Sequence, residues 1–249
     1  MNKKNIVAGN WKMNKTPLQG KRFIDDVKNR VKDIHNTEII FFPAFTGLLD
    51  NQLNYPFHLG AQNCHWETSG AFTGEVSTEM LNECNVQYIL AGHSERRQLF
   101  KETDAIINKK IRSINSSKLK PILCIGETIE DRKSGLTKGF LKNQLVKNLE
   151  GIDSIENFIV AYEPIWAIGT GETASEEQIH NAHSFIKSVL KKLYPGTNNC
   201  PILYGGSVNT KNAKELIQIS GVDGFLIGGA SLDQDSFISI INDVEKFRR

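Results

Sequence analysis

A short apolar run, then a loop, then a stretch with helical periodicity form a unit that recurs along the whole chain. The apolar runs cover residues 5–9, 38–42, 57–62, 87–92, 121–126, 158–162, 201–205 and 224–228. Runs this short and this apolar are typical of strands buried on both faces, as in a parallel sheet covered by helices. Strands that alternate with helices predict parallel pairing through right-handed crossovers.

Eight such units in 249 residues predict an α/β fold, a closed (β/α)8 or TIM barrel with eight parallel strands. The competing architecture is an open doubly wound sheet, which usually has fewer strands and a glycine fingerprint after the first one. Here Asn10, Trp11 and Lys12 follow the first run instead. No linker or change in composition interrupts the pattern, so we expect a single domain over residues 1–249.

The charge balance argues against some classes of partner. Lys and Arg number 30 against 28 Asp and Glu, which leaves a net charge of +2, and the basic residues are scattered. This pattern favours neither a nucleic-acid nor a membrane partner. The first apolar run is too short for a signal peptide, and the four cysteines form no CxxC pair, so we expect reduced thiols and a cytoplasmic location.

The loops after the strands build the active site in barrels of this type, so the residues just beyond each run are the candidates. They include an amide, a lysine, a histidine, a carboxylate and two glycine-rich turns, namely Asn10, Lys12, His93, Glu163, Gly205-Gly206-Ser207 and Gly228-Gly229. The two turns follow the last two runs, where such barrels usually bind phosphate through backbone N–H groups, with residues 230–232 as a short helix. The alternative is that these glycines only make tight turns.

The segment from 158 to 174 predicts a lid over the site. Glu163 ends a buried run, and Pro164 prevents further ladder pairing. An apolar stretch with flexible glycine neighbours then follows before the capping box of Ser175 and Gln178 opens a helix. The predicted lid comprises Pro164, Ile165, Trp166, Ala167, Ile168, Gly169, Thr170 and Gly171. An ordinary connection with a solvated Glu163 is the alternative.

The residue types around this site favour proton transfer. Glu163 is the only carboxylate that we expect at a strand end near the glycine turns, and a lone Glu in a dry, closable site is suited to general-base catalysis. His93 precedes the apparent helix start at Ser94, and the positive end of a helix favours a neutral imidazole that donates a hydrogen bond. Lys12 supplies positive charge, and Asn10 an amide donor.

Each of these residues also has a structural interpretation, because a lone histidine is often structural and most lysines are solvated. Taken together they indicate proton abstraction next to the carbonyl of a small phosphorylated molecule.

A metal site is not predicted. His180 and His183 have suitable spacing, but their helix belongs to the outer ring, where we expect a solvated face. No cluster of carboxylates points to Mg²⁺.

Several motifs in the same order resemble those of the triosephosphate isomerase family. They are Asn10-Trp11-Lys12, Gly92-His93-Ser94-Glu95-Arg96-Arg97, Ala161-Tyr162-Glu163-Pro164-Ile165-Trp166 with Gly169-Thr170-Gly171, Tyr204-Gly205-Gly206-Ser207 and Gly228-Gly229-Ala230-Ser231. The resemblance runs from the first apolar run to the last. It implies interconversion of dihydroxyacetone phosphate and D-glyceraldehyde 3-phosphate, in glycolysis and gluconeogenesis, with no metal and no organic cofactor.

The resemblance also implies a role for each residue. Glu163 moves a proton between two substrate carbons through an enediolate, and His93 acts at the substrate oxygens. Lys12 supplies charge, Asn10 orients the substrate, and Glu95 supports Lys12 and His93. The N–H groups of Gly169, Ser207, Gly228 and Gly229 bind the phosphate.

A homodimer is implied as well, because the loop after the third strand of this family reaches into the partner. In this chain that loop covers residues 64–75 and carries Trp66, Phe72 and Thr73.

Two residues depart from the family pattern. Glu172 stands at the far end of the lid where lysine is more common, and Ala91 replaces a common valine.

Two other functions stay open at this point. The first is another sugar-phosphate isomerase or synthase built on the same barrel, which would share the glycine turns but lack Glu163 under this lid. The second is a catalytically silent phosphate binder or a surface-displayed interaction protein, which would need no base.

Overall fold

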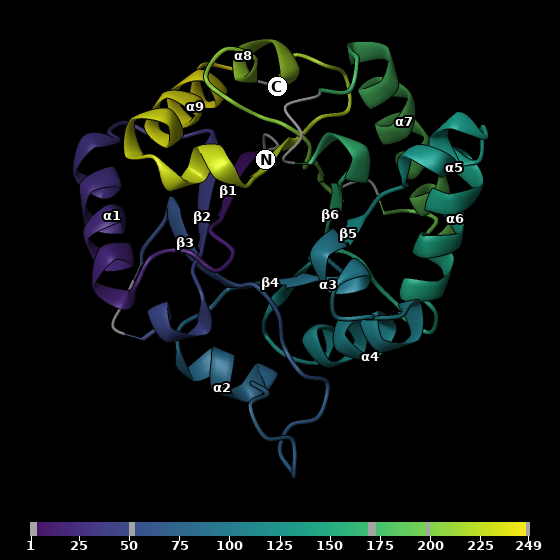
Figure 1. Cartoon of the computed structure of the whole chain (residues 1–249), viewed down its shortest axis with the longest axis horizontal. Coiled ribbons are helices and arrows are strands. Elements are labelled where there is room, and N and C mark those ends of the chain that lie inside the picture. The colour runs from purple at the N-terminus through teal and green to yellow at the C-terminus, as the bar shows by residue number, and fades with distance from the viewer. Residues whose placement is uncertain (1–3, 50–52, 169–172, 198–199, 248–249) are drawn as a thin grey trace.

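The computed structural model of the chain describes residues 4–49, 53–168, 173–197 and 200–247. Over these ranges, parallel strands pair in chain order and β8 returns to β1, which closes the barrel (Figure 1). The eight-stranded barrel predicted from the sequence is therefore confirmed. The strands are β1 (Asn5–Asn10), β2 (Thr37–Phe42), β3 (Phe57–Ala61), β4 (Tyr88–Ala91), β5 (Lys120–Ile125), β6 (Ile159–Tyr162), β7 (Ile202–Tyr204) and β8 (Gly224–Ile227).

Helices surround the strands as an outer ring (Figure 1). Three short 3-10 helices, η1 (Phe45–Gly47), η2 (Ile165–Ala167) and η3 (Gly229–Leu232), lie in loops that follow strands in the described ranges. The α-helices there are α1 (Pro17–Arg30), α2 (Thr78–Glu83), α3 (Ser94–Gln98), α4 (Asp104–Asn115), α5 (Ile129–Lys133), α6 (Thr137–Asn148), α7 (Glu176–Leu193), α8 (Ala213–Leu216) and α9 (Gln234–Lys246). None of the described helices is both long and apolar enough to cross a membrane.

The predicted strand ends differ from the observed ones by one residue in most cases. β1 extends to Asn10 because this residue still pairs with Phe42 of β2. β4 stops at Ala91 because Gly92 has a φ of 76°, a left-handed conformation that breaks the ladder. Both differences concern a candidate site residue. Asn10 is the last residue of β1, and His93 follows the sharp turn at Gly92.

Capping boxes fix the starts of two long helices, α1 and α7, and the sequence predicts the second of them. The Thr16 hydroxyl accepts a hydrogen bond from the Gln19 N–H, and the Gln19 side chain accepts from the Thr16 N–H. Ser175 and Gln178 make the same pair of bonds at the start of α7. A cap of this kind typically stabilises a helix by about 1 kcal/mol. The second box fixes the point at which the lid segment ends and α7 begins.

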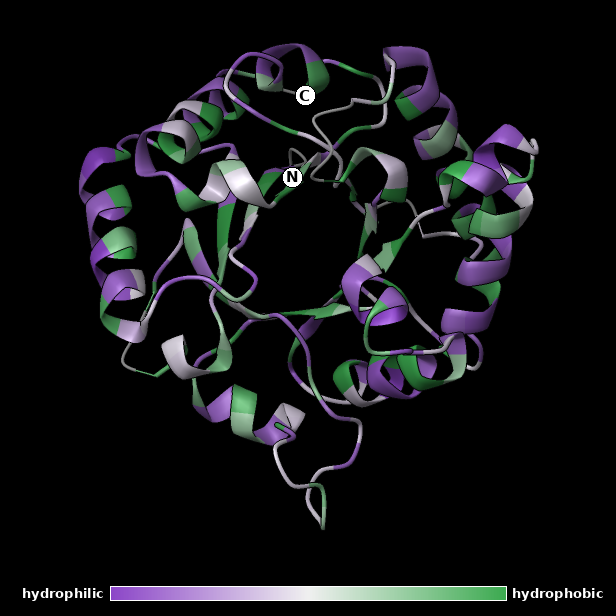
Figure 2. Cartoon of the chain, in the orientation of Figure 1, coloured by the Kyte–Doolittle hydropathy of each residue, from purple (hydrophilic) through white to green (hydrophobic). Residues whose placement is uncertain are grey.

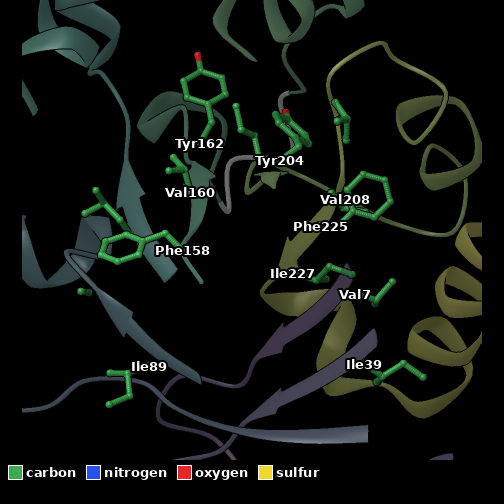
Figure 3. Close-up of a cluster of buried hydrophobic side chains, with 14 of the residues drawn as sticks. Val7, Ile39, Ile89, Phe158, Val160, Tyr162, Tyr204, Val208, Phe225 and Ile227 are labelled. Carbon is green, nitrogen blue, oxygen red and sulfur yellow. The ribbon is translucent and has the colours of Figure 1, made fainter. Parts of the chain in front are cut away.

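The core has two parts because side chains alternate across each strand. One cluster combines outward-facing strand residues such as Val7 and Ile227 with apolar faces of the helices, and Figure 3 shows part of it. The other contains strand residues only and fills the inside of the barrel. Its members are Ile6, Ala8, Ile40, Phe42, Tyr88, Leu90, Ile122, Cys124, Ile159, Ala161, Leu203 and Leu226. Figure 2 accordingly shows mostly hydrophobic strands enclosed by a ring of helices that carry both hydrophobic and hydrophilic residues.

This alternation aims two candidate residues at the barrel axis. Asn10 continues the inward series of Ile6 and Ala8 in β1, and Glu163 continues the inward series of Ile159 and Ala161 in β6. Both polar side chains therefore cap the apolar interior at the carboxyl ends of their strands, where ligand sites form in such barrels.

Candidate active site

A cavity of about 290 Å³ opens at the carboxyl ends of the strands. This volume is near the lower limit of roughly 300 Å³ that is usual for small-molecule sites. The lining residues are Asn10, Lys12, His93, Glu163, Ile168, Gly205, Gly206, Ser207, Val208, Asn209, Leu226, Gly228, Gly229 and Ala230. The barrel thus brings the predicted amide, lysine, histidine, carboxylate and glycine turns to one place. Gly169, Thr170, Gly171 and Glu172 lie outside the described residues.

Glu163 is almost completely buried, with 2% of its surface exposed, and both of its carboxylate oxygens have partners. Oε2 accepts a hydrogen bond of 3.1 Å from the backbone N–H of Ser94. Oε1 lies 3.2 Å from Nε2 of His93. The start of α3 therefore holds the carboxylate at the edge of the cavity, next to the imidazole.

Two glycines make the space that Glu163 occupies. A Cβ on Gly126 would lie 1.7 Å from the backbone oxygen of Glu163, which only glycine avoids. A Cβ on Gly205 would lie 2.8 Å from Cγ of Glu163. Close packing of the strand ends thus leaves no room for a larger residue beside the Glu163 backbone at position 126 or beside its side chain at position 205.

A hydrogen bond to His93 defines which of its two ring nitrogens carries the proton of the neutral imidazole. His93 is the N-cap of α3, and its Nδ1 accepts a hydrogen bond of 3.2 Å from the N–H of Glu95. A nitrogen that accepts carries no proton, so the remaining proton of the neutral ring is on Nε2. Nε2 is the atom that faces Glu163, and it is therefore a hydrogen-bond donor at the cavity.

Lys12 lies between Glu95 and the last glycine turn. Its Nζ is 2.7 Å from Oε1 of Glu95, and a Cβ on Gly228 would lie 3.8 Å from the same nitrogen. The backbone of Lys12 has a φ of 53°, and its N–H donates to Oδ1 of Asn10 at 3.1 Å. This bond turns the NH₂ group of the Asn10 amide away from the Lys12 backbone.

The predicted short helix after the last strand is η3, which confirms that expectation. The hydroxyl of Ser231 donates to the carbonyl oxygens of Gly228 and Ile227, at 2.7 and 3.1 Å. These bonds fix the first turn of η3 against β8, with Gly228 and Gly229 at the cavity wall. Backbone N–H groups at such a turn are suited to binding an anion.

A second carboxylate that the sequence analysis did not single out, Glu127, stands two residues beyond β5 and is fully buried, although it is not among the residues that line the cavity. Its Oε1 accepts hydrogen bonds from the Tyr162 hydroxyl at 3.0 Å and the Trp166 indole at 3.3 Å. Arg132 also pairs with this oxygen, at 3.0 Å. The sequence signal was its place just after the 121–126 run, which is the same signal that singled out Glu163.

Glu127 therefore anchors the described part of the lid to the barrel. Trp166 belongs to η2, and Ala167 of the same turn is fully buried. The carbonyl oxygen of Ala167 accepts a hydrogen bond of 2.9 Å from the Ser207 hydroxyl. Beyond the lid, the N–H of Ala174 donates to the Tyr204 hydroxyl at 3.3 Å, and burial raises the pKa of Tyr204 to about 12.

The expectation of a solvated face for both histidines of α7 was wrong for His183. His180 is exposed, but His183 is fully buried, with Nδ1 3.0 Å from the carbonyl oxygen of Gly221. It shares the inward face of α7 with Ile179 and Ile186. Within the described residues, no group of three or more His, Cys, Asp or Glu side chains is arranged to hold a metal ion.

The loop after β3 extends outward beyond the ring of helices (Figure 1). Phe72 of this loop is 42% exposed, and its ring contacts that of His65 with centroids 4.4 Å apart. His65 also stacks on Trp66, with centroids 4.1 Å apart. The loop is therefore organised by its own aromatic residues, with Thr73 exposed beside Phe72.

The comparisons with known proteins agree with this geometry. A family model described as triosephosphate isomerase matches residues 5–244. The "Triosephosphate isomerase" of Alkaliphilus metalliredigens is 45% identical over 96% of this chain and 99% of its own length. The proteins of the same name from Lactobacillus delbrueckii subsp. lactis and Prosthecochloris aestuarii are 45% and 42% identical over 97% and 98% of this chain and 99% of their own lengths. The chain belongs to the triosephosphate isomerase family.

Proposed function

We propose that Glu163 is the base with which this chain interconverts dihydroxyacetone phosphate and D-glyceraldehyde 3-phosphate. The reaction itself is that of the family to which the chain belongs, in glycolysis and gluconeogenesis. The assignment of these roles rests on one observation, which is that the candidate residues lie around the same cavity. Glu163, His93 and Lys12 line one small cavity together with Ser207, Gly228 and Gly229.

The reaction begins with the substrate phosphate at the glycine turns. The N–H groups of Ser207, Gly228 and Gly229 bind the phosphate oxygens, and Lys12 adds a positive charge beside Gly228. The three-carbon part of the substrate then extends toward Glu163 and His93. Gly169 is proposed as a further phosphate donor.

Proton transfer follows from the arrangement of the two side chains. Glu163 exchanges its bonds with Ser94 and His93 for the substrate and removes a proton from the carbon beside the carbonyl. The charge that develops on the carbonyl oxygen is stabilised by the Nε2–H of His93, by Lys12 and by the amide of Asn10. A proton then passes from the substrate hydroxyl oxygen to the former carbonyl oxygen by way of His93, and Glu163 returns its own proton to the neighbouring carbon of the enediolate, so that the carbonyl group moves by one carbon. Glu95 supports this step by holding Lys12 and donating its N–H to His93.

The lid covers the cavity during this step. Residues 164–171 follow Glu163 directly, and Ile168 already lines the cavity. Exclusion of water strengthens the electrostatic contacts and protects the enediolate from loss of phosphate.

We propose a homodimer that is formed through residues 64–75. Two neighbouring segments, joined by the Lys12–Glu95 ion pair, carry exposed apolar residues. They are Met13, Leu99 and Phe100, with exposed fractions of 94%, 71% and 63%. An inserted loop from a partner, bearing Trp66, Phe72 and Thr73, would cover such residues.

The cytoplasm is the proposed location, since the four cysteines are free thiols and thiols persist in reducing compartments.

The test of the base is Glu163→Gln, measured by isomerisation of D-glyceraldehyde 3-phosphate in the presence of EDTA. We expect fast turnover by the wild-type chain, and a loss of about 10³-fold in kcat for the variant with phosphate binding retained. Glu176→Gln, an exposed carboxylate on α7, is the matched control. In D₂O, the wild-type chain should place deuterium on the substrate carbon, and Glu163→Gln should not.

Unchanged turnover in Glu163→Gln would refute the assignment of the base. A folded wild-type chain that binds phosphate without turning over this substrate would instead support the silent binder.

A further inference from the structure

The loop between β1 and α1 contains a second lysine whose side chain lies at the other end of η3. Nζ of Lys15 donates a hydrogen bond of 2.8 Å to the carbonyl oxygen of Leu232, the last residue of η3. The same ammonium group lies 4.3 Å from the ring centroid of Phe23 and 5.6 Å from that of Trp11. Lys15 is half-buried by these contacts.

The backbone at this position argues that the side chain is needed. Lys15 has a φ of 66°, in the left-handed region where side chains are disfavoured and glycine is not. Glycine would adopt this turn at lower cost, so the turn alone gives no reason for a lysine. The contacts that the ammonium group makes with Leu232 and the two aromatic rings offset that cost.

The contact with Leu232 completes the fixation of η3. Ser231 ties the carbonyl oxygens of Ile227 and Gly228 at the start of the turn. Lys15 ties the carbonyl oxygen at its end, and a cation there also complements the dipole of the turn. Asp233, the N-cap of α9, follows Leu232 directly and adds an attractive charge for Lys15. Both ends of η3 are therefore held, while Gly228 and Gly229 face the cavity.

We propose that Lys15 is a positioning residue for the phosphate end of the substrate, which it serves by fixing the orientation of η3. This inference rests on the proposed function, since it takes Gly228 and Gly229 as phosphate donors. Lys15 touches Leu232 and no residue that lines the cavity in the contacts described, so it acts on binding through the backbone of η3. Lys12, three residues earlier, stands by contrast at the cavity itself.

The variant Lys15→Met tests this role, because methionine keeps an apolar side chain against Phe23 but removes the ammonium group. Two substrates separate phosphate binding from chemistry, namely D-glyceraldehyde 3-phosphate and unphosphorylated D-glyceraldehyde. We expect kcat/KM to fall about tenfold for the phosphorylated substrate, the usual effect of losing a charge-assisted hydrogen bond, which corresponds to about 1.4 kcal/mol. For D-glyceraldehyde we expect no change. The inhibition constant of inorganic phosphate should rise by the same factor as the first loss.

Lys15→Gly is the second variant, since it removes the side chain and relieves the left-handed backbone together. It should show the same selective loss. Lys21→Met, an exposed lysine of α1, is the control that should match the wild-type chain.

Equal losses with both substrates would overturn the proposal, because they would reflect a general structural change. A wild-type kcat/KM for the phosphorylated substrate in Lys15→Met would also overturn it, as would full recovery of that kcat/KM in Lys15→Gly. Wild-type turnover of D-glyceraldehyde 3-phosphate is measured in the same series, and its absence would instead count against the proposed function.

Discussion

At the scale of single residues, the position of Glu163 depends on neighbours that have no side chain. Gly126 and Gly205 directly follow β5 and β7, and a Cβ on either glycine would clash with Glu163. The carboxylate also needs donors on α3, so three segments far apart in the sequence define one side chain. A catalytic geometry of this kind is sensitive to small displacements, since a shift of about 1 Å can cost about 100-fold in rate.

Gly205→Ala should therefore lower kcat by about 100-fold while the chain stays folded. The new methyl group would meet Cγ of Glu163 at 2.8 Å, and the buried side chain has little space in which to move. Steady-state kinetics and circular dichroism provide the measurement. Gly139→Ala is the control, because a Cβ at this exposed position of α6 meets nothing within 4 Å, and it should leave kcat unchanged. An active Gly205→Ala variant would show that the carboxylate tolerates displacement.

At the scale of secondary-structure elements, the amino ends of the strands form a polar cluster opposite the candidate site. Tyr88 of β4 donates a hydrogen bond of 2.7 Å to Glu38 of β2, and His58 of β3 lies 3.8 Å from the same carboxylate oxygen. Burial lowers the pKa of His58, and the charges of Lys120 and Lys4 lower it further, while Glu38 raises it. The net direction is downward, so the folded chain holds His58 in its neutral form.

This shift predicts a loss of stability as the pH falls below the ordinary histidine pKa of about 6.5. Between the lowered folded pKa and about 6.5 the unfolded chain binds more protons, so the free energy of unfolding decreases as the medium becomes more acidic. His58→Gln should reduce this decrease, measured by urea unfolding at several pH values. His35→Gln, at an exposed position, should keep the wild-type slope. An identical slope in His58→Gln would show that His58 does not contribute.

At the scale of the whole molecule, the closed barrel gives a rigid frame, and the loop of residues 64–75 extends from it (Figure 1). Barrel closure removes the free edges of the sheet, so these strands cannot associate with another chain through their edges. The proposed dimer uses loops instead, and its exposed apolar residues lie in the loops around Lys12 and α3. We also expect residues 1–249 to unfold as one domain.

The change Phe72→Asp should produce monomers at micromolar concentration, because it would place an unpaired charge in the proposed interface. Sedimentation velocity should give dimer mass for the wild-type chain and monomer mass for the variant. Leu136→Asp is the control, since Leu136 is also exposed but lies at the start of α6. Monomer mass for the wild-type chain would refute the dimer, and a dimeric Phe72→Asp variant would refute the assignment of this loop.

Much of the architecture follows from signals that are local in the sequence. Apolar runs of about five residues predicted the strands, and the capping box at Ser175 predicted the start of α7. The order of these signals was sufficient for the barrel, because parallel strands linked by right-handed crossovers have few ways to pair. The rule that ligands bind at the carboxyl ends of the strands then pointed to Asn10, His93 and Glu163.

Only the tertiary structure decided which of these groups touch and what holds them. Glu127 contacts Trp166, and Lys15 donates a hydrogen bond to Leu232, although both pairs are remote in sequence. The burial of His183 likewise depends on segments that are distant along the chain. No local pattern contains such pairs, since they depend on the register of the strands and on the closure of β8 against β1. The sequence by itself determined the barrel and the chemical groups at its rim. The closure of the barrel determined their distances, because it brings the loops of residues 12–16 and 228–233 side by side.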